Sequence, residues 1–395
     1  MVRITYVTHT RFPSQRGHGK QIAEVCAAMA ALGHRVTLLC PGIANVITRD
    51  AFSFYGLKRT FQVEPLSHFD ATHRFWIPGI AQFRVNMWFF RRALRSYLKH
   101  HRADLLYARS PLLLPVLLKT RIPVILELHE LPRFRKKRFA KRCNRCARVV
   151  CLTKLMRDEL AAGGGQPKRV VVEPDGVDLE RFREYEVKES RRSRRSQKQP
   201  VPVVGYVGSF FTRDKIDKGV VILLEALALL KRRGVKIRGK FSGGWGDEAK
   251  PFVRQARLLR LEDHVQFDGF RPASLIPLEL AACTVLIYPA PASKHPYFQR
   301  DTSPLKLFEY LAAGKPIVCA DLPPLREVVS KGQVFFFTPG DAGSLAHWIA
   351  YIIDHPKEAA KRAAAGKRLV QRYDWKKRME RILRAVPAAS GRPTK

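Results

Sequence analysis

Two carboxylates in the stretch DTSPLKLFEYLAAGKPIVCADLPPLREVV, residues 301–329, have the spacing and surroundings of a binding site. Asp301 and Glu309 are separated by seven residues, and Glu309 interrupts the run Leu-Phe-Glu-Tyr-Leu, which otherwise suits a buried helix. A buried carboxylate without a partner costs several kcal/mol, so Glu309 needs one. Its partner is either an internal Arg or Lys, or a polar ligand such as a ribose diol.

The surrounding residues predict a helix over residues 304–313. Ser303 is a favourable N-cap, Pro304 suits the first helical position, and Gly314 ends the helix. This helix follows a predicted strand at 285–288, so its N-terminus should lie near the carboxyl edge of a sheet. Free amide groups and the helix dipole favour an anion at such an end.

A second anion-binding pattern lies earlier, in VPVVGYVGSFFTRDKIDKG, residues 201–219. A strand runs into a loop that carries Arg213, Lys215 and Lys218, and a helix begins directly afterwards. Strand, basic loop and helix start form a phosphate-binding arrangement, with Lys218-Gly219 as its best candidate. The P-loop pattern GxxxxGK[ST] is absent, and the alternative is a solvated cluster of charges.

The elements that must position these residues alternate between β-rich and helical patterns. We predict strands at 3–8, 36–40, 105–107, 123–127, 149–152 and 170–173, and again in VPVVGYVGS at 201–209 and at 236–241, 265–267, 285–288, 316–319 and 333–337. Helices are predicted at 20–32 and 220–232, and a long helical stretch at 341–386. The rhythm is typical of two α/β units with parallel sheets. Residues 188–200, which have no apolar side chain except the closing proline, indicate a solvated linker between them.

The composition limits the binding partners and the cellular setting that we expect for this protein. With 72 Lys and Arg against 34 Asp and Glu, the chain carries a formal charge of +38. This suits nucleic acid, an anionic membrane surface or phosphorylated substrates. No apolar run is long enough to span a bilayer, and no secretory signal is expected at the start. Seven scattered cysteines, with the CxxC of residues 143–146 standing alone, indicate reduced thiols rather than a zinc site.

The chain resembles the retaining glycosyltransferases of family 4, which have the GT-B fold of two facing Rossmann-like domains with a central cleft. The resemblance covers nearly the whole chain. It is carried by the two spaced acids, by GYVGSFFTRDKIDKG, FSGGW and VQFDGFRP in the second half, and by ITYVTHTRFPSQRGHGKQIAEVCAAMAALGHRVTLL and EPDGVDLERF in the first. It implies an acceptor-binding domain over 1–186, a basic linker over 187–200, a nucleotide-sugar domain over 201–365, and a C-terminal helix over 366–395 that packs back toward the first domain before a tail.

The resemblance also implies roles in holding a nucleotide-sugar donor. Glu309 matches the acid that binds the ribose, and Asp301 matches the first acid, normally Glu, which faces the donor sugar. The backbone of Ser303 and Leu305 and the side chain of Lys218 match groups that bind the diphosphate. Family members often carry an arginine where this chain has Ser209 and Phe210, and Arg213 is the expected replacement. Gly17 and Gly19 match the loop that approaches the phosphates. Gly243 and Phe270 match residues at the nucleotide edge.

His129, in VILELHELPR, matches a histidine that many family members place near the reacting carbon. His9 and His18 also lie in loops that compete for this place. We expect His129 and Asp301 to act at the donor sugar, with Lys218, Arg213 and the helix start near Ser303 stabilising the leaving diphosphate. Positive groups can replace a divalent ion, and no metal-ligand pattern is present, so we expect neither a metal nor another cofactor.

Two basic and aromatic stretches in the first half predict docking on an anionic bilayer. Residues 83–101 place Phe83, Met87, Phe90, Leu94 and Tyr97 on one helical face, which also fits an ordinary packed helix. Basic and aromatic residues expected to meet the membrane are Arg91, Arg95 and Trp88 in this stretch, and Arg135, Lys136, Lys137 and Arg138 in residues 131–148. A solvated face is the alternative for the second stretch.

The expected protein is therefore a metal-independent glycosyltransferase with a lipid-linked saccharide or glycolipid acceptor, attached to the cytoplasmic face of the cell membrane and active in polysaccharide or lipopolysaccharide synthesis. Two other functions stay open. A sugar-nucleotide epimerase on the same fold would use water in place of an acceptor. A nucleic-acid-binding protein would fit the charge, but no zinc finger, recognition helix or RRM signature is present.

Overall fold

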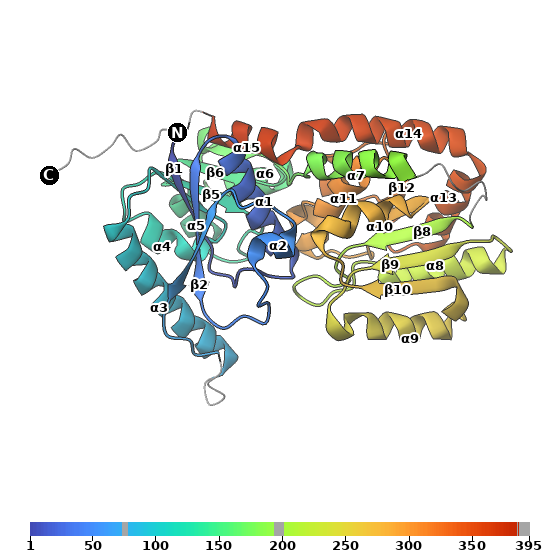
Figure 1. Cartoon of the computed structure of the whole chain (residues 1–395), viewed down its shortest axis with the longest axis horizontal. Helices are drawn as coiled ribbons and strands as arrows, with labels where there is room; N and C mark the ends of the chain where they lie inside the picture. Colours follow the sequence, from blue (N-terminus) through green and yellow to red (C-terminus); the bar gives the residue numbers. More distant parts are fainter. Residues whose placement is uncertain (73–77, 193–200, 385, 387–395) are drawn as a thin grey trace. The chain divides into compact units, whose positions relative to one another are not determined.

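Two parallel β-sheets, one in each of two α/β units, organise the chain (Figure 1). The structure is a computed structural model that describes residues 1–72, 78–192, 201–384 and 386. Unit 1 comprises Met1–Pro174 and Trp375–Lys395, and unit 2 comprises Asp175–Asp374. The predicted fold class is confirmed: each unit has the β-α-β alternation that a parallel sheet requires.

Unit 1 has a seven-stranded parallel sheet in the order β3-β2-β1-β4-β5-β6-β7. The strands are β1 Arg3–Val7, β2 Arg35–Gly42, β3 Gln62–Ser67, β4 Leu105–Ala108, β5 Val124–Leu128, β6 Arg148–Cys151 and β7 Val170–Val172. Since β1 has β2 on one side and β4 on the other, the direction of winding reverses between β1 and β4. Ligands of such sheets bind beyond the carboxyl ends of the strands at this switch point.

The helices of unit 1 cover both faces of its sheet. They are α1 Gly17–Ala31, α2 Ala51–Tyr55, α3 Gly79–His100, α4 Leu114–Leu117, α5 Lys136–Cys143, α6 Lys154–Ala162 and α15 Trp375–Leu383. Apolar residues of α3, α4, α5 and α6 form one buried cluster with the sheet, and α1 packs with α15. The side chains of β5 alternate accordingly: Leu126 and Leu128 join that cluster, whereas Glu127 does not.

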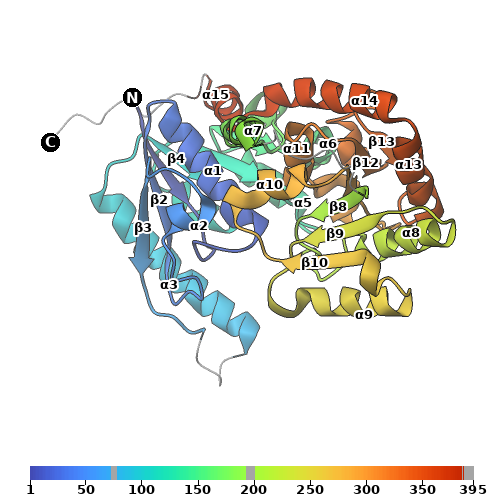
Figure 2. The same cartoon turned by 45° about the vertical axis from the view of Figure 1, so that its right-hand side comes forward.

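Unit 2 has a six-stranded parallel sheet in the order β10-β9-β8-β11-β12-β13, with its switch point between β8 and β11. Figure 2 shows β8, β9 and β10 side by side in this sheet. The strands are β8 Val203–Val207, β9 Arg238–Ser242, β10 Val265–Gly269, β11 Val285–Tyr288, β12 Ile317–Ala320 and β13 Phe335–Phe337. The helices are α7 Leu179–Arg192, α8 Val220–Arg232, α9 Lys250–Leu258, α10 Ile276–Ala281, α11 Leu305–Ala312, α12 Pro323–Arg326, α13 Ala342–Asp354 and α14 Pro356–Leu369. Helices α8 and α13 pack together, and α11 packs against α14.

The division between the units differs from the predicted boundary at residue 186. Leu179 and Phe182 of α7 are buried in the apolar core of unit 2, so the chain joins that unit from Asp175. The predicted linker over 187–200 begins as the end of α7, and its residues 193–200 lie outside the described part. At the other end, the helix that packs in unit 1 is α15, which begins at Trp375 rather than at 366; most of the predicted tail lies outside the described residues.

Two further expectations differ from the structure. The predicted helical stretch over 341–386 is three helices, because Pro356 starts a new helix and a short 3-10 turn at Val370–Tyr373 precedes α15. Strand β3 was not predicted, because its sequence QVEPLS contains a proline and lacks apolar alternation. Within the described residues, no helix has both the length and the apolar character needed to cross a bilayer.

Candidate functional site

The carboxyl ends of β8 and β9 approach each other closely in unit 2. Gly243 follows β9 at a φ of 146°, and a Cβ on it would lie 1.9 Å from the carbonyl oxygen of Gly208, which follows β8. A hydrogen bond from Gly208 N to Ser242 O also joins the ends of β8 and β9, and another from Gly243 N to Gly269 O joins the loop after β9 to the end of β10. Glycine at 243 is therefore required by backbone packing beside the predicted nucleotide edge.

Lys218 lies in the loop that links β8 to α8. Its Nζ donates a hydrogen bond to Ser209 Oγ at 2.6 Å and lies 5.5 Å from the ring centre of Tyr297. The predicted helix-start contribution at Lys218-Gly219 is wrong, however. The carboxylate of Asp217 accepts from Val220 N and Val221 N, so it already caps the first amides of α8. An anion here would be held by the ammonium of Lys218 rather than by the end of α8.

Gly219 fixes where α8 begins. It has a φ of 95°, and a Cβ on it would lie 2.7 Å from Ala290 N, just after β11. Lys218 is thereby held beside the switch point between β8 and β11. Arg213, in the same loop, is exposed, and its proposed reach to the phosphates stays a prediction.

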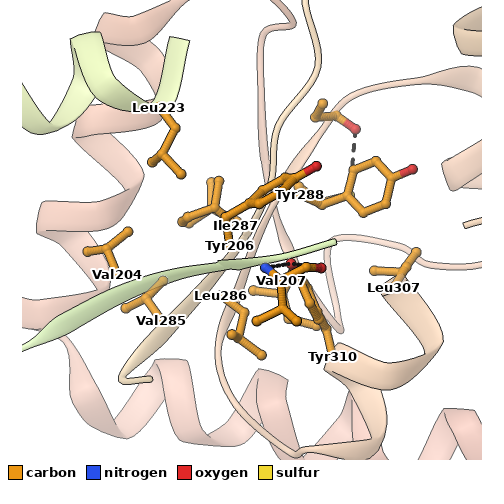
Figure 3. Packing of buried hydrophobic residues seen from close by; sticks show 14 of the residues in the cluster. Val204, Tyr206, Val207, Leu223, Val285, Leu286, Ile287, Tyr288, Leu307 and Tyr310 are labelled. Atoms are coloured by element: carbon orange, nitrogen blue, oxygen red, sulfur yellow. Dashed lines mark hydrogen bonds between the residues drawn. The ribbon is translucent and has the colours of Figure 1, made fainter. Parts of the chain in front are cut away.

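Helix α11 begins at Leu305, one residue later than predicted, and its capping differs from the prediction. Ser303 does not cap it: Ser303 Oγ accepts a hydrogen bond from Asp175 N at 2.7 Å. The helix is instead anchored by Tyr310, whose hydroxyl bonds both Val207 N and Val207 O at the end of β8 (Figure 3). The start of α11 is thus placed near the carboxyl ends of the strands, with Ser303 and Leu305 half-buried.

The two spaced acids lie in different environments. Glu309 is half-buried on α11 rather than fully enclosed. Asp301 ends a π-helical turn, Tyr297–Asp301, and receives two hydrogen bonds from the neighbouring Arg300, at 2.5 and 2.8 Å. A contact between Asp301 and a donor sugar would therefore compete with the guanidinium of Arg300.

An aromatic pair stands at the predicted nucleotide edge. Phe270 follows β10, and its ring packs edge-to-face with Trp245 at a centroid distance of 4.8 Å. Trp245 is 43% exposed, in the loop that begins at Gly243. Exposed rings of this kind can stack on a nucleobase. Sequence reasoning found Phe270 but missed Trp245, although the tryptophan follows directly on the FSGG loop.

Unit 2 holds a second cation besides Lys218, namely Lys306, which was not predicted from the sequence. Its ammonium donates to Tyr206 Oη at 3.2 Å and lies 4.2 Å from the ring centre of Tyr288. The signal was available, because Lys306 interrupts the same apolar helix as Glu309 three residues earlier.

Three histidines and an arginine gather at the switch point of unit 1. His9 follows β1, Arg109 follows β4, His129 follows β5, and His18 lies in the first turn of α1. Burial together with the charges of Arg109 and the other histidines lowers the pKa of His18 to about 3. The structure thus brings all three predicted histidines together and adds Arg109, which sequence reasoning missed.

His129 is held by a buried carboxylate. Its Nε2 lies 2.8 Å from Glu127 Oε1, and Glu127 also accepts hydrogen bonds from Gln21 and Tyr107. Burial alone would raise the pKa of Glu127. The charge of Arg378 together with hydrogen bonds outweighs burial and holds this pKa well below its usual value. Burial also lowers the pKa of His129 to about 4. Ionised Glu127 can only accept, so neutral His129 donates from Nε2 and keeps Nδ1 as an acceptor.

The predicted glycine loop of unit 1 has an internal explanation. Gly17 is exposed at the first residue of α1. A Cβ on Gly19 would lie 2.2 Å from Tyr55 Oη, and that hydroxyl bonds both the N–H and the carbonyl of Ser14. Packing against Tyr55 therefore suffices to require glycine at 19, and the approach of both glycines to phosphate stays a prediction.

The predicted membrane-docking residues of α5 are largely exposed. Arg135, Lys136, Lys137 and Arg138 are all exposed, and Lys136 also pairs with Glu159 at 2.7 Å. Of the two aromatic side chains in this stretch, Phe134 is 82% exposed and Phe139 packs into the core. Of these two aromatic side chains, only Phe134 could therefore enter a bilayer.

Helix α3 behaves as a packed helix with one exposed aromatic side. Met87, Phe90 and Leu94 are buried as predicted, but Phe83 and Trp88 are 49% and 58% exposed. Arg91 donates to the carbonyl oxygen of Leu112, and Arg95 is exposed. Burial and the nearby charge of Arg142 lower the pKa of Arg91. Basic side chains of α3 and α5 therefore lie near each other at this point.

The sequence matches two family models that together cover most of the chain. Residues 15–181 match the model of Glycosyltransferase Family 4, and residues 187–369 match that of Glycosyl transferases group 1.

Curated relatives are similar over part of their length. A protein of Salmonella typhimurium, named as a colanic acid biosynthesis glycosyltransferase, WcaL, is 26% identical over 214 residues, which are 52% of this chain and 48% of that protein. The phosphatidyl-myo-inositol mannosyltransferase of Mycobacterium leprae is 27% identical over 185 residues, 46% of each chain. The chain thus spans about half the length of the curated relatives it matches.

A solved structure is similar over nearly the whole chain. Anabaena HepE in complex with UDP and glucose has a TM-score of 0.70 and 20% identity, covering 97% of this chain and 98% of that one. At this identity the likeness shows a common fold.

Proposed function

The chain belongs to the family 4 glycosyltransferases and has their GT-B fold, and we propose that it moves a sugar from a nucleoside-diphosphate sugar to an acceptor hydroxyl with retention of anomeric configuration. In this reaction the bond between the anomeric carbon and the diphosphate breaks. The acceptor oxygen bonds to that carbon and loses its proton, and the diphosphate leaves with added negative charge.

Unit 2 is proposed to hold the donor. Lys218 supplies positive charge at the switch point of the sheet, where the leaving diphosphate would need it. Electrostatic preorganisation of this kind often contributes more to catalysis than any other single effect. Trp245 and Phe270 would face the base, and Glu309 would accept hydrogen bonds from the ribose. HepE, with the same fold, has been solved with UDP and glucose, which supports a nucleotide-sugar donor.

His129 is proposed to orient the donor sugar. With its Nε2–H directed at Glu127, neutral Nδ1 is left to accept a hydrogen bond from a sugar hydroxyl. Asp301 would take the corresponding part in unit 2, once its pair with Arg300 is opened or shared. Because Lys218 carries the needed charge, we propose that the reaction requires neither a metal ion nor another cofactor.

The acceptor is proposed to be a lipid-linked saccharide or glycolipid, in the synthesis of a cell-surface polysaccharide or lipopolysaccharide. One similar protein is named for colanic acid biosynthesis and another for mannosylation of a phosphatidyl-inositol, and both support such an acceptor. The exposed basic residues of α5, together with Phe134, support attachment to an anionic bilayer. We place the protein at the cytoplasmic face of the cell membrane.

The observation that carries the donor assignment is that Lys218, the start of α11 and the aromatic pair all lie in connections that follow the carboxyl ends of strands in one sheet. The test is incubation with UDP-, GDP- and ADP-sugars, with and without a polyprenyl-linked or phosphatidylinositol acceptor. A glycoside formed only with acceptor supports the proposal. Free epimerised sugar would instead indicate an epimerase, and salt-sensitive RNA binding without any turnover would indicate a nucleic-acid-binding protein.

A further inference from the structure

We infer that Lys306 binds the diphosphate of the donor together with Lys218 and so supplies the second cation of the phosphate site; this rests on the proposed function. Ser209 directly follows the glycine after β8, and Arg213 is exposed further along the same loop. Lys306 reaches the same place from α11.

A chain of hydrogen bonds joins the two ammonium groups. Lys306 Nζ donates to Tyr206 Oη at 3.2 Å, and Tyr206 Oη donates to the carbonyl oxygen of Ser209 at 2.7 Å. From the other side, Lys218 Nζ donates to Ser209 Oγ at 2.6 Å. The two lysines therefore converge on Ser209, Lys218 directly and Lys306 through Tyr206.

The ammonium group of Lys306 is surrounded by aromatic faces rather than by carboxylates. Its Nζ lies 4.3 and 4.2 Å from the ring centres of Tyr206 and Tyr288, whose faces attract positive charge. Gly208 leaves room for it, because a Cβ there would lie 3.3 Å from Lys306 Cδ. Among the described residues, no carboxylate forms an ion pair with Lys306.

Electrostatics support the same assignment. Burial and the neighbouring charge of Lys218 lower the pKa of Lys306 well below its usual value; the thiol of Cys319 and the carboxylate of Asp217 oppose this. The other titratable groups that face it are the hydroxyls of Tyr206 and Tyr288. The like charges of Lys218 and Lys306 repel each other, and a bound diphosphate relieves that repulsion.

The experiment compares wild type with Lys306→Met and Lys306→Arg. Lys315→Met is the matched control, because Lys315 is a partly buried lysine just beyond the other end of α11. Calorimetry measures the dissociation constants of UDP, GDP and ADP and of the corresponding nucleosides. The readout is the ratio of nucleoside to diphosphate constants, which isolates the contribution of the phosphates.

For the base that wild type prefers, we expect Lys306→Met to lower this ratio about tenfold or more, since hydrogen bonds to charged groups are the strong ones. Lys306→Arg should retain most of it, and Lys315→Met all of it. Ligand-free Lys306→Met should melt at or above the wild-type temperature, because an unneutralised cation has been removed; a merely structural lysine would lower it.

An unchanged ratio in a folded Lys306→Met protein would overturn the inference while leaving the proposed function intact. If Lys306→Met does not fold, Lys306→Gln takes its place, and an unchanged ratio in that folded variant would overturn the inference in the same way. Failure of wild type to bind any of the three diphosphates would overturn the proposed function and this inference with it.

Discussion

Arg378 and Glu127 are both completely buried, and the guanidinium nitrogen of one lies 3.2 Å from the carboxylate oxygen of the other. Arg378 comes from α15, near the end of the chain, and also donates to the carbonyl oxygens of Glu173 and Pro174. Glu127 in turn holds His129. Helix α15 therefore neutralises the carboxylate that orients a candidate site residue in unit 1.

Removal of Arg378 should destabilise unit 1 strongly. Arg378→Met leaves Glu127 buried without its cation, which typically costs about 3–5 kcal/mol. Arg381→Met on the same helix is the matched control: Arg381 pairs with Glu173 but is 36% exposed, so about 1 kcal/mol or less is expected. Hydrogen exchange of the amides of β5 measures both effects. Equal losses in the two variants would contradict the role given to the buried pair.

Unit 1 should lose stability in mild acid through His129. Its pKa is about 4 in the folded protein and 6.5 when unperturbed, so the unfolded chain binds more protons between these values. The free energy of unfolding therefore falls as the pH drops from 6.5 to 4, by about 3 kcal/mol from this group. Below pH 4.5 the depressed pKa of Glu127 adds a further loss, completed as the pH falls through its folded value.

Urea denaturation at several pH values checks this expectation. His129→Gln should show a flatter pH dependence than wild type between pH 6.5 and 4, and His100→Gln, at an exposed position on α3, should not. Parallel curves for wild type and His129→Gln would show that another group carries the acid sensitivity.

Substitution of Gly243 should disturb the loops at the proposed nucleotide edge. A methyl group there would overlap Gly208 O, so Gly243→Ala should separate the loops after β8 and β9 and cost on the order of 3 kcal/mol. Gly246→Ala is the control, because Gly246 has a φ of 55° but open space around it, and about 1–2 kcal/mol is expected. Thermal melts of both variants measure the difference, which should vanish if the close approach is unimportant.

Loss of the basic residues of α5 should release the protein from anionic membranes. Each Lys or Arg near such a surface contributes about 1 kcal/mol, so replacement of residues 135–138 by Ser should weaken binding roughly a hundredfold or more. Vesicles of phosphatidylglycerol and phosphatidylcholine, read by co-sedimentation, provide the assay. The control replaces four exposed basic residues of unit 2, Arg232, Arg233, Lys236 and Arg238. Equal binding by both variants would argue against docking through α5.

Much of the fold could be predicted from sequence because buried parallel strands are short apolar runs. Strand 285–288 and helix 220–232 have the predicted bounds, since Tyr288 is followed by proline and Gly219 starts the helix. Edge strand β3 could not be predicted because its residues mostly face solvent, so its sequence lacks the run of apolar residues that marks the buried strands. The unit boundary was misplaced because the charged residues after α7 dominate the local composition, whereas the packing of Leu179 and Phe182 decides it.

The candidate site was predictable only in part. The position of Glu309 in an apolar helix predicts a site residue. Lys306 interrupts the same helix, but the sequence pattern did not lead us to predict a role for it. The cap supplied by Asp217 and the bond between Ser303 and Asp175 depend on tertiary geometry that spacing alone does not contain. Likewise, only the fold shows that His9, His18, His129 and Arg109 follow neighbouring elements of one sheet.

The central claim is that Glu309 holds the ribose of a nucleotide in unit 2. It is tested most directly by measuring the affinity of wild type and Glu309→Gln for a nucleoside diphosphate and for its 2′,3′-dideoxy analogue. Wild type should prefer the diol by about 1.5–3 kcal/mol, the usual range for hydrogen bonds to a charged group, and the variant should lose most of that preference. An equal preference for the diol in both proteins would contradict the claim.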